Sequence, residues 1–491
     1  MQRVITFRVS IFTLILLLSI STGAFAVTTQ TGTLSDGATY LIEVPSPWNG
    51  TLLLYNHDYV VPGNPNPAVD VGDSTTGGYL LANGFALAGS SYAHTGWAIQ
   101  EAFVDQMALL DTFVSSFGTP TQTITWGHGL GAMIAAGLME RFPTRFNGAL
   151  PMCGELGGTV AAFNRGLNAA FTFKTILAAN TALQVVNITD PNSNVNLAEQ
   201  ILAQNQATAK GRARLSLVFA MGDSPGWFDP SSPEPAATDY ATREANQFQW
   251  AKNFIFPVVF GLRAELEARA GGNGSWNNNV DYNVQLSKSI DQDEVNALYS
   301  QNNLNLTADL KALNNAATIT ADPNALNYLE QNTFYNGVIT SPVLTLHTVA
   351  DGLMDVEQES SYLDVVREGN SLSQLSQIYV HRAGHAAFTP AETITALQNL
   401  IQRINTGTWP NLDQSVLNAQ ATALGSSLNT SPPAFLNFTP AEFLRPFDAY
   451  DASNCAPASV PLSPQISAQA GPTPQTGPIG EIVEIPPGTC P

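Results

Sequence analysis

The sequence predicts an α/β fold in which a mostly parallel sheet of about eight strands is flanked by helices. Short, wholly apolar runs alternate with helically spaced segments before about residue 155, and the same alternation returns after about residue 340. Within the first of these regions, at residues 123–133, an apolar run leads through a glycine-rich turn directly into a helical pattern. Strands that are apolar throughout are covered on both faces, which is typical of parallel sheets.

The expected elements follow the chain in order. In the first part, apolar runs predict strands over residues 39–44, 51–55, 85–90, 123–126 and 148–152. Helices are expected where apolar residues recur at helical spacing, over 102–117 and 130–141. In the last third, we expect strands over 343–347 and 377–381 and a helix over 390–405.

Residues 156–337 interrupt this alternation. They are rich in Ala, Asn, Leu and Gln and predict helices and loops rather than strands. We therefore expect a large helical cap inserted between the two halves of one core, residues 27–155 and 338–405. Residues 406–491 predict a loop-like C-terminal extension that ends in a tail rich in Pro and Gly.

Composition excludes several classes of protein. Of the 491 residues 44% are hydrophobic and 12% are charged, so the chain has enough apolar material for a core and is not a disordered acidic protein. Nineteen basic and 39 acidic residues give a net charge of −20. Such a surface repels phosphate backbones, and we expect no nucleic-acid partner. No stretch after the N-terminal segment is long and apolar enough to predict a membrane span.

Residues 1–26 predict a secretory signal peptide. Arg3 and Arg8 give a positive start, an apolar run follows at 11–20, and Ala-Phe-Ala at 24–26 is a small-x-small cleavage site. An uncleaved anchor is the alternative. We expect a secreted or periplasmic protein.

The chain contains three cysteines. Because disulfides persist in exported proteins, we expect Cys455 and Cys490 to pair and to tie down the tail. Cys153 would then be left over. It follows an apolar strand, so we expect a buried, inert thiol.

The strongest local motif is Gly127-His128-Gly129-Leu130-Gly131. A strand that enters a glycine-rich turn and continues at once as a helix is the setting of the G-x-S-x-G nucleophile elbow. Here the nucleophile position is Gly129, which has no hydroxyl and cannot form an acyl-enzyme. His128 is expected to shape the turn rather than to act as a base.

Three further segments agree with this motif. Asn56-His57-Asp58-Tyr59 follows an expected strand, residues 343–355 end in Asp351 and Asp355, and Gly384-His385 follows the last expected strand. Residues 85–97, an expected strand and the loop after it, are a fourth segment of this kind. In their chain order of nucleophile position, acid and histidine, these segments resemble the α/β-hydrolase superfamily, within its secreted esterase-like and peptidase-like branch.

The resemblance implies a role for each matching residue. His385 would be the base and Asp351 the acid that orients it, with Asp355 in the same loop as the alternative acid. The oxyanion hole would use the Leu130 N–H and an N–H near Asp58 or Tyr59.

Two departures from the family pattern are present, Gly129 for serine and His57-Asp58 for the usual His-Gly. A carboxylate at Asp58 opposes an oxyanion unless it points away. His57 is expected either to pack or to line the pocket, and a water activated by His385 would have to take the place of the serine.

Other nucleophiles and a metal are weaker hypotheses. Gly222-Asp223-Ser224-Pro225-Gly226 matches G-x-S-x-G, but it follows a helical pattern and a proline follows its serine. Ser90 and Ser91 follow a strand and could approach the pocket. His57, Asp58, His128 and His385 could converge, but no metal-binding spacing is present, so we expect no metal and no cofactor.

Two functions of different classes remain. The first is a secreted hydrolase of ester or related acyl bonds, with a small-molecule or polymeric ester as substrate and weak or altered activity because of Gly129. The second is a ligand-binding protein that has the fold without the catalysis. A trivial alternative is that Gly129 was introduced. If only the hydroxyl is missing, Gly129→Ser should gain esterase activity, alone or with Asp58→Gly.

Overall fold

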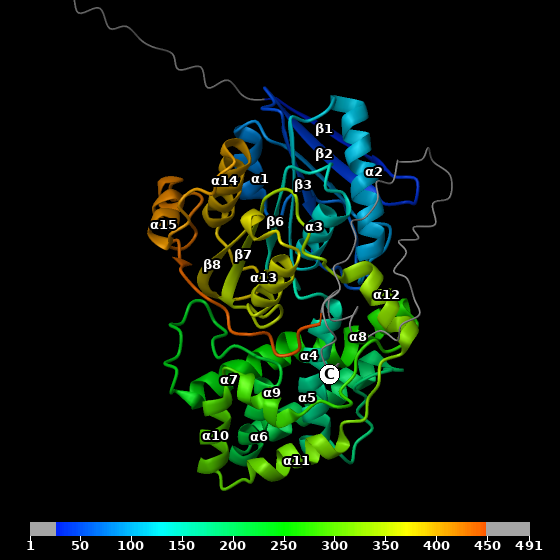
Figure 1. Cartoon of the computed structure of the whole chain (residues 1–491), viewed down its shortest axis with the longest axis vertical. Coiled ribbons are helices and arrows are strands. Elements are labelled where there is room, and N and C mark those ends of the chain that lie inside the picture. Colours follow the sequence, from blue (N-terminus) through cyan, green and yellow to red (C-terminus); the bar gives the residue numbers. More distant parts are fainter. Residues whose placement is uncertain (1–25, 448–491) are drawn as a thin grey trace, which may run out of the picture.

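The structure is a computed structural model, and it describes residues 26–447. Within these residues nine strands form one sheet in the order β1-β2-β4-β3-β5-β6-β7-β8-β9 (Figure 1). The strands are β1 Ala26–Thr33, β2 Thr39–Ser46, β3 Thr51–Asn56, β4 Ala86–Ser90, β5 Gln122–His128, β6 Gly148–Met152, β7 Val343–Ala350, β8 Leu375–Ala383 and β9 Phe435–Leu436. The pairings from β4 through β8 are all parallel, and β1, β2 and β9 are antiparallel to their neighbours. The prediction of a mostly parallel sheet is confirmed.

Helices cover both faces of the sheet. Strand residues alternate between two apolar clusters, so that Leu52 and Leu54 face one side and Leu53 faces the other. The first side packs against α2 Ile99–Phe117, α3 Leu130–Arg141 and α13 Gln358–Glu368. The second packs against α1 Ser74–Ala82, α14 Pro390–Thr406 and α15 Gln414–Ala423. This arrangement explains why the parallel strands are apolar throughout.

The residues between β6 and β7 form a separate helical body, drawn below the sheet in Figure 1. Its α-helices are α4 Thr159–Leu177, α5 Pro191–Gln206, α6 Ala209–Ala220, α7 Tyr240–Trp250, α8 Arg263–Ala270, α9 Tyr282–Lys288, α10 Gln292–Gln301, α11 Leu306–Ala316 and α12 Pro323–Thr333. Short π-helical segments, η1 Ala251–Ile255 and η2 Val258–Leu262, connect α7 to α8. A 3-10 turn, η3 Leu372–Gln374, precedes β8. Two further apolar clusters fill this body. Its role as a cap stays a prediction.

The expectation of a loop-like chain beyond residue 406 is wrong for two segments. The Asp413 side chain accepts a hydrogen bond from the Ser415 N–H and starts α15, and β9 adds a short edge strand beside β8. The signal peptide before Ala26 and the expected Cys455–Cys490 pair lie outside the described residues. Cys153 is buried, and burial raises the pKa of its thiol. No helix within residues 26–447 is long and apolar enough to cross a membrane.

Candidate active site

The turn between β5 and α3 has the backbone of a nucleophile elbow. Gly129 has φ 52° and ψ −119°, a conformation that side chains rarely adopt. A Cβ on Gly127 would lie 2.3 Å from the Asn56 carbonyl oxygen, and one on Gly131 would lie 2.0 Å from it. The outer glycines are therefore required by the close approach of this turn to the end of β3.

Asp351 and His385 meet at the same edge of the sheet, because β7 and β8 are parallel neighbours and each residue follows one of them. His385 Nδ1 lies 2.8 Å from Asp351 Oδ2. The other oxygen, Oδ1, accepts hydrogen bonds from the N–H groups of Leu353 and Met354, each at 3.0 Å. These backbone donors fix the carboxylate in the loop, and Asp351 therefore orients His385.

The Asp58 carboxylate occupies the place of the missing hydroxyl. A Cβ built on Gly129 would lie 2.1 Å from Asp58 Oδ1 and 2.6 Å from Oδ2. Oδ1 accepts hydrogen bonds from the Leu130 N–H at 2.8 Å and from the Tyr59 N–H at 2.6 Å. Oδ2 lies 3.3 Å from His385 Nε2. The resulting cluster is Asp58–His385–Asp351.

This geometry corrects two expectations. The Asp58 carboxylate does not point away from the site, and it accepts hydrogen bonds from both N–H groups that we expected to stabilise a substrate oxyanion. A carboxylate, rather than a water, takes the place of the serine hydroxyl. Its side chain is 38% exposed, whereas the His385 side chain is 14% exposed and that of Asp351 is fully buried. Asp58 is thus the member of the cluster most open to a substrate.

Both nitrogens of His385 face carboxylates, which only accept hydrogen bonds when ionised, so this geometry favours the doubly protonated imidazolium. Burial alone would lower the pKa of His385, but Asp351 and Asp58 raise it well above its usual value. Burial alone would raise the pKa of Asp58, but His385 and the two backbone N–H groups lower it. These contacts favour the protonated form of His385 and the ionised form of Asp58.

A second histidine lies behind Asp351, and the sequence analysis missed it. His347, within β7, has Nε2 4.0 Å from Asp351 Oδ2. Its Nδ1 lies 3.1 Å from Glu359 Oε1, and its Nε2 lies 2.8 Å from the Met354 carbonyl oxygen. Burial alone would lower the pKa of His347, but Glu359 and Asp351 raise it. The signal in the sequence was a histidine, the one ionisable residue of the strand expected over residues 343–347.

The alternative acid, Asp355, does not reach His385. Its Oδ1 pairs with Arg165 Nη2 at 2.8 Å, and the residue is 1% exposed. The Arg165 side chain comes from α4, so this ion pair joins the core to the helical body. Asp355 thus has a structural partner, whereas Asp351 has the histidine.

The other candidates have structural roles. The His128 ring faces Tyr55, whose hydroxyl lies 3.1 Å from His128 Nδ1, and burial lowers the pKa of His128 to about 4. His57 stacks on Tyr92 with ring centroids 3.9 Å apart, so it packs rather than lines a pocket. Ser224 follows α6, as its helical context predicted.

The serines after β4 are also engaged. Ser91 Oγ accepts a hydrogen bond from the Thr39 N–H, and Ser90 Oγ accepts one from the Tyr92 N–H. Both residues are buried. Neither is available as a nucleophile in this arrangement.

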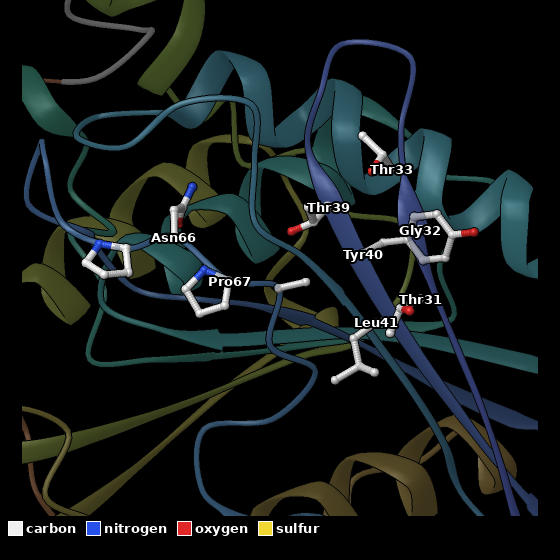
Figure 2. Close-up of a pocket in the computed structure, with 10 residues that line it drawn as sticks. Thr31, Gly32, Thr33, Thr39, Tyr40, Leu41, Asn66 and Pro67 are labelled. Carbon is white, nitrogen blue, oxygen red and sulfur yellow. The ribbon is translucent and has the colours of Figure 1, made fainter.

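Two further groups of residues have the form of a binding site. Cys153, His347 and Asp351 have ligand atoms within 4.8 Å of one another, but hydrogen bonds already engage both His347 nitrogens. Figure 2 shows an open surface pocket formed by β1, β2 and residues 65–68. Asp58, Asp351 and His385 do not line it, and it contains no histidine, cysteine or carboxylate.

The comparisons find an amidase that is similar in sequence and esterases that are similar in structure. No family model matches the chain. It is 29% identical over 429 residues to an o-phthalyl amidase from Xanthobacter agilis, with 81% of this chain and 92% of that protein covered.

Similar solved structures are two esterases from Aspergillus oryzae. One is described as an esterase, with 12% identity, 79% of this chain and 81% of the other covered, and a TM-score of 0.42. The other is feruloyl esterase B, with 14% identity, coverage of 79% and 82%, and a TM-score of 0.42. The strand order, the elbow and the acid–histidine pair of this chain are those of an α/β-hydrolase fold.

Proposed function

We propose that this protein hydrolyses amide or ester bonds of an acyl substrate at the Asp58–His385–Asp351 cluster. The observation that supports this most is the position of Asp58. Its carboxylate lies where a serine hydroxyl would lie and is within reach of His385 Nε2. A group that can attack or activate water is therefore present, although the elbow carries glycine.

For the substrate we propose an o-phthalyl amide. The proposal rests on the relative from Xanthobacter agilis, which is named an o-phthalyl amidase and is covered over 92% of its length. Amide hydrolysis needs a proton for the departing nitrogen. The His385 imidazolium is placed to supply it, since its Nε2 is directed at Asp58 and the side chain is partly exposed.

The test is hydrolysis of an o-phthalyl anilide by the full-length protein, followed by release of the aniline. We expect turnover in the native protein and a loss of about 10³-fold or more in Asp58→Asn and in His385→Ala. Asp111→Asn is the matched control, because Asp111 pairs with Arg145 on the surface. It should leave the rate unchanged.

Absence of turnover of both the anilide and short-chain nitrophenyl esters would contradict the proposed function. Binding of the anilide without turnover would favour the ligand-binding alternative. We further propose that the protein is exported, and N-terminal sequencing of protein recovered outside the cytoplasm tests this. A start at Val27 is expected, and an intact Met1 in that fraction would contradict cleavage.

A further inference from the structure

The two oxygens of the Asp58 carboxylate have different surroundings. Oδ1 is held by two backbone donors, the N–H groups of Leu130 and Tyr59. Oδ2 has one contact, with His385 Nε2 at 3.3 Å. The side chain is 38% exposed. One oxygen is thus fixed by two backbone donors, and the other is held by His385 alone among the hydrogen-bond donors, on a side chain that is partly exposed.

On this basis, and resting on the proposed function, we propose that Asp58 is a covalent nucleophile supplied by the loop after β3 rather than by the elbow. Asp58 Oδ2 forms a bond to the acyl carbon of the substrate, and the bond from that carbon to the leaving nitrogen or oxygen breaks. The product of this step is a mixed anhydride between the acyl group and Asp58.

The proton of the first step comes from His385. Its Nε2–H lies beside Oδ2 and therefore beside the carbon that Oδ2 attacks. As the C–N bond breaks, this proton moves to the amine, which leaves neutral. The imidazole that remains is hydrogen-bonded to Asp351 through Nδ1 and is now a base.

The second step hydrolyses the anhydride at Asp58. His385 takes a proton from a water while the water oxygen bonds to Asp58 Cγ. The negative charge develops on Oδ1, where the Leu130 and Tyr59 N–H groups already point. Collapse expels the acyl group as a carboxylate and leaves Asp58 with one oxygen from water. Loss of a proton to solvent restores the starting site.

The contacts of Asp58 favour this route over simple general-base catalysis, because both oxygens already face N–H groups, those of Leu130 and Tyr59 at Oδ1 and His385 Nε2 at Oδ2. A general base should hold a proton readily, but its contacts lower the pKa of Asp58. The flanking carboxylates keep His385 protonated at rest, which suits a proton donor in the first step and not a base. Consumption of the Asp58 charge in the anhydride removes one of these carboxylates and frees His385 to accept a proton.

The deciding experiment follows oxygen from labelled water. Native protein in excess over o-phthalyl anilide carries out a single turnover in water enriched in oxygen-18, and the peptide that contains Asp58 is then analysed by mass spectrometry. We expect the label in the Asp58 carboxylate and an unlabelled product in the first turnover. Protein incubated in the same water without substrate is the control and should carry no label.

A variant gives a second measurement. In His385→Gln the activation of water is lost, while a nitrophenolate leaving group needs no proton. This variant should release about one equivalent of nitrophenolate in a burst and gain the mass of the acyl group at Asp58. The double variant with Asp58→Asn should show neither effect.

The outcomes separate the two proposals. Turnover with the label only in the product and never in Asp58 would overturn the covalent route and leave the hydrolase function standing. No turnover of any acyl substrate would overturn the hydrolase function and the covalent route together.

Discussion

Two histidines flank Asp351, and their surroundings differ. His347 lies on the inner side and is completely buried, with both nitrogens engaged by Glu359 and the Met354 carbonyl. His385 lies on the outer side and is partly exposed, and its second nitrogen faces the accessible carboxylate of Asp58. The comparison teaches that a charged histidine closed on all sides is part of the framework, whereas one that faces an open carboxylate can take part in chemistry.

The largest expected effect on activity is at the outer histidine. His385→Ala should lower the rate on the anilide by about 10³-fold or more, because the proton donor and acceptor is removed. The melting temperature should fall less than in a variant of the inner histidine, because Asp351 keeps the hydrogen bonds from the Leu353 and Met354 N–H groups. Rate assays and thermal melts of the same preparation check this. If His385→Ala kept the native rate, His385 would not be the histidine that takes part in the chemistry.

The inner histidine should give the opposite pattern. His347→Ala removes the ion-pair partner of the buried Glu359 carboxylate, which keeps only its hydrogen bonds from Thr345 and Gln377, and should cost about 3–5 kcal/mol of unfolding free energy. Urea unfolding measures this. His347→Gln, which can still donate one hydrogen bond, should recover part of the loss. A stable His347→Ala protein with abolished activity would instead place His347 in the chemistry.

A third prediction concerns the place that Asp58 fills. Gly129→Ser alone should gain no esterase activity and should lose about 1–3 kcal/mol, because its Cβ would lie 2.1 Å from Asp58 Oδ1. Of the two expectations, Gly129→Ser alone or with Asp58→Gly, the position of Asp58 favours the second. Gly129→Ser with Asp58→Gly should gain activity on nitrophenyl esters that a serine-directed phosphonate abolishes. Activity in the single variant would argue that Asp58 moves aside freely.

The smallest effect is expected at Glu155, a buried residue that interacts electrostatically with Asp58 and His385. Burial raises the pKa of Glu155 to about 8, although Arg165 acts to lower it. The native state therefore keeps a proton that the unfolded chain loses, and stability should fall as pH rises from about 5 to 8. Glu155→Gln should flatten this slope and raise the melting temperature at pH 8 by about 2–4 °C. Melts across pH measure it, and an unchanged slope would exclude Glu155 as the group responsible.

The elbow and the Asp351–His385 pair could be predicted from the sequence. Both depend on local spacing and on parallel strands, whose ends share one edge of the sheet. The choice between Asp351 and Asp355 needed three dimensions, because the N–H groups of Leu353 and Met354 and the partner Arg165 separate two similar loop residues.

The role of Asp58 could not be derived from spacing alone. In the sequence, Gly129 and Asp58 are two separate departures from the family pattern. Only the structure shows that the Asp58 carboxylate fills the space that a side chain at position 129 would occupy. Similarly, β1 was missed because it is a half-exposed, polar edge strand, and α15 because it is a short helix in a segment without sustained periodicity.

The carboxylate at the nucleophile position also determines which reagents can find this protein. Fluorophosphonate probes, which survey proteomes for active serine hydrolases, react with an activated hydroxyl, and within residues 26–447 this cluster offers none. An accessible carboxylate beside an imidazolium instead reacts with epoxides and carbodiimides. A proteome survey with serine-reactive probes would therefore not detect α/β-hydrolase folds of this kind, whereas a carboxylate-reactive probe would detect them.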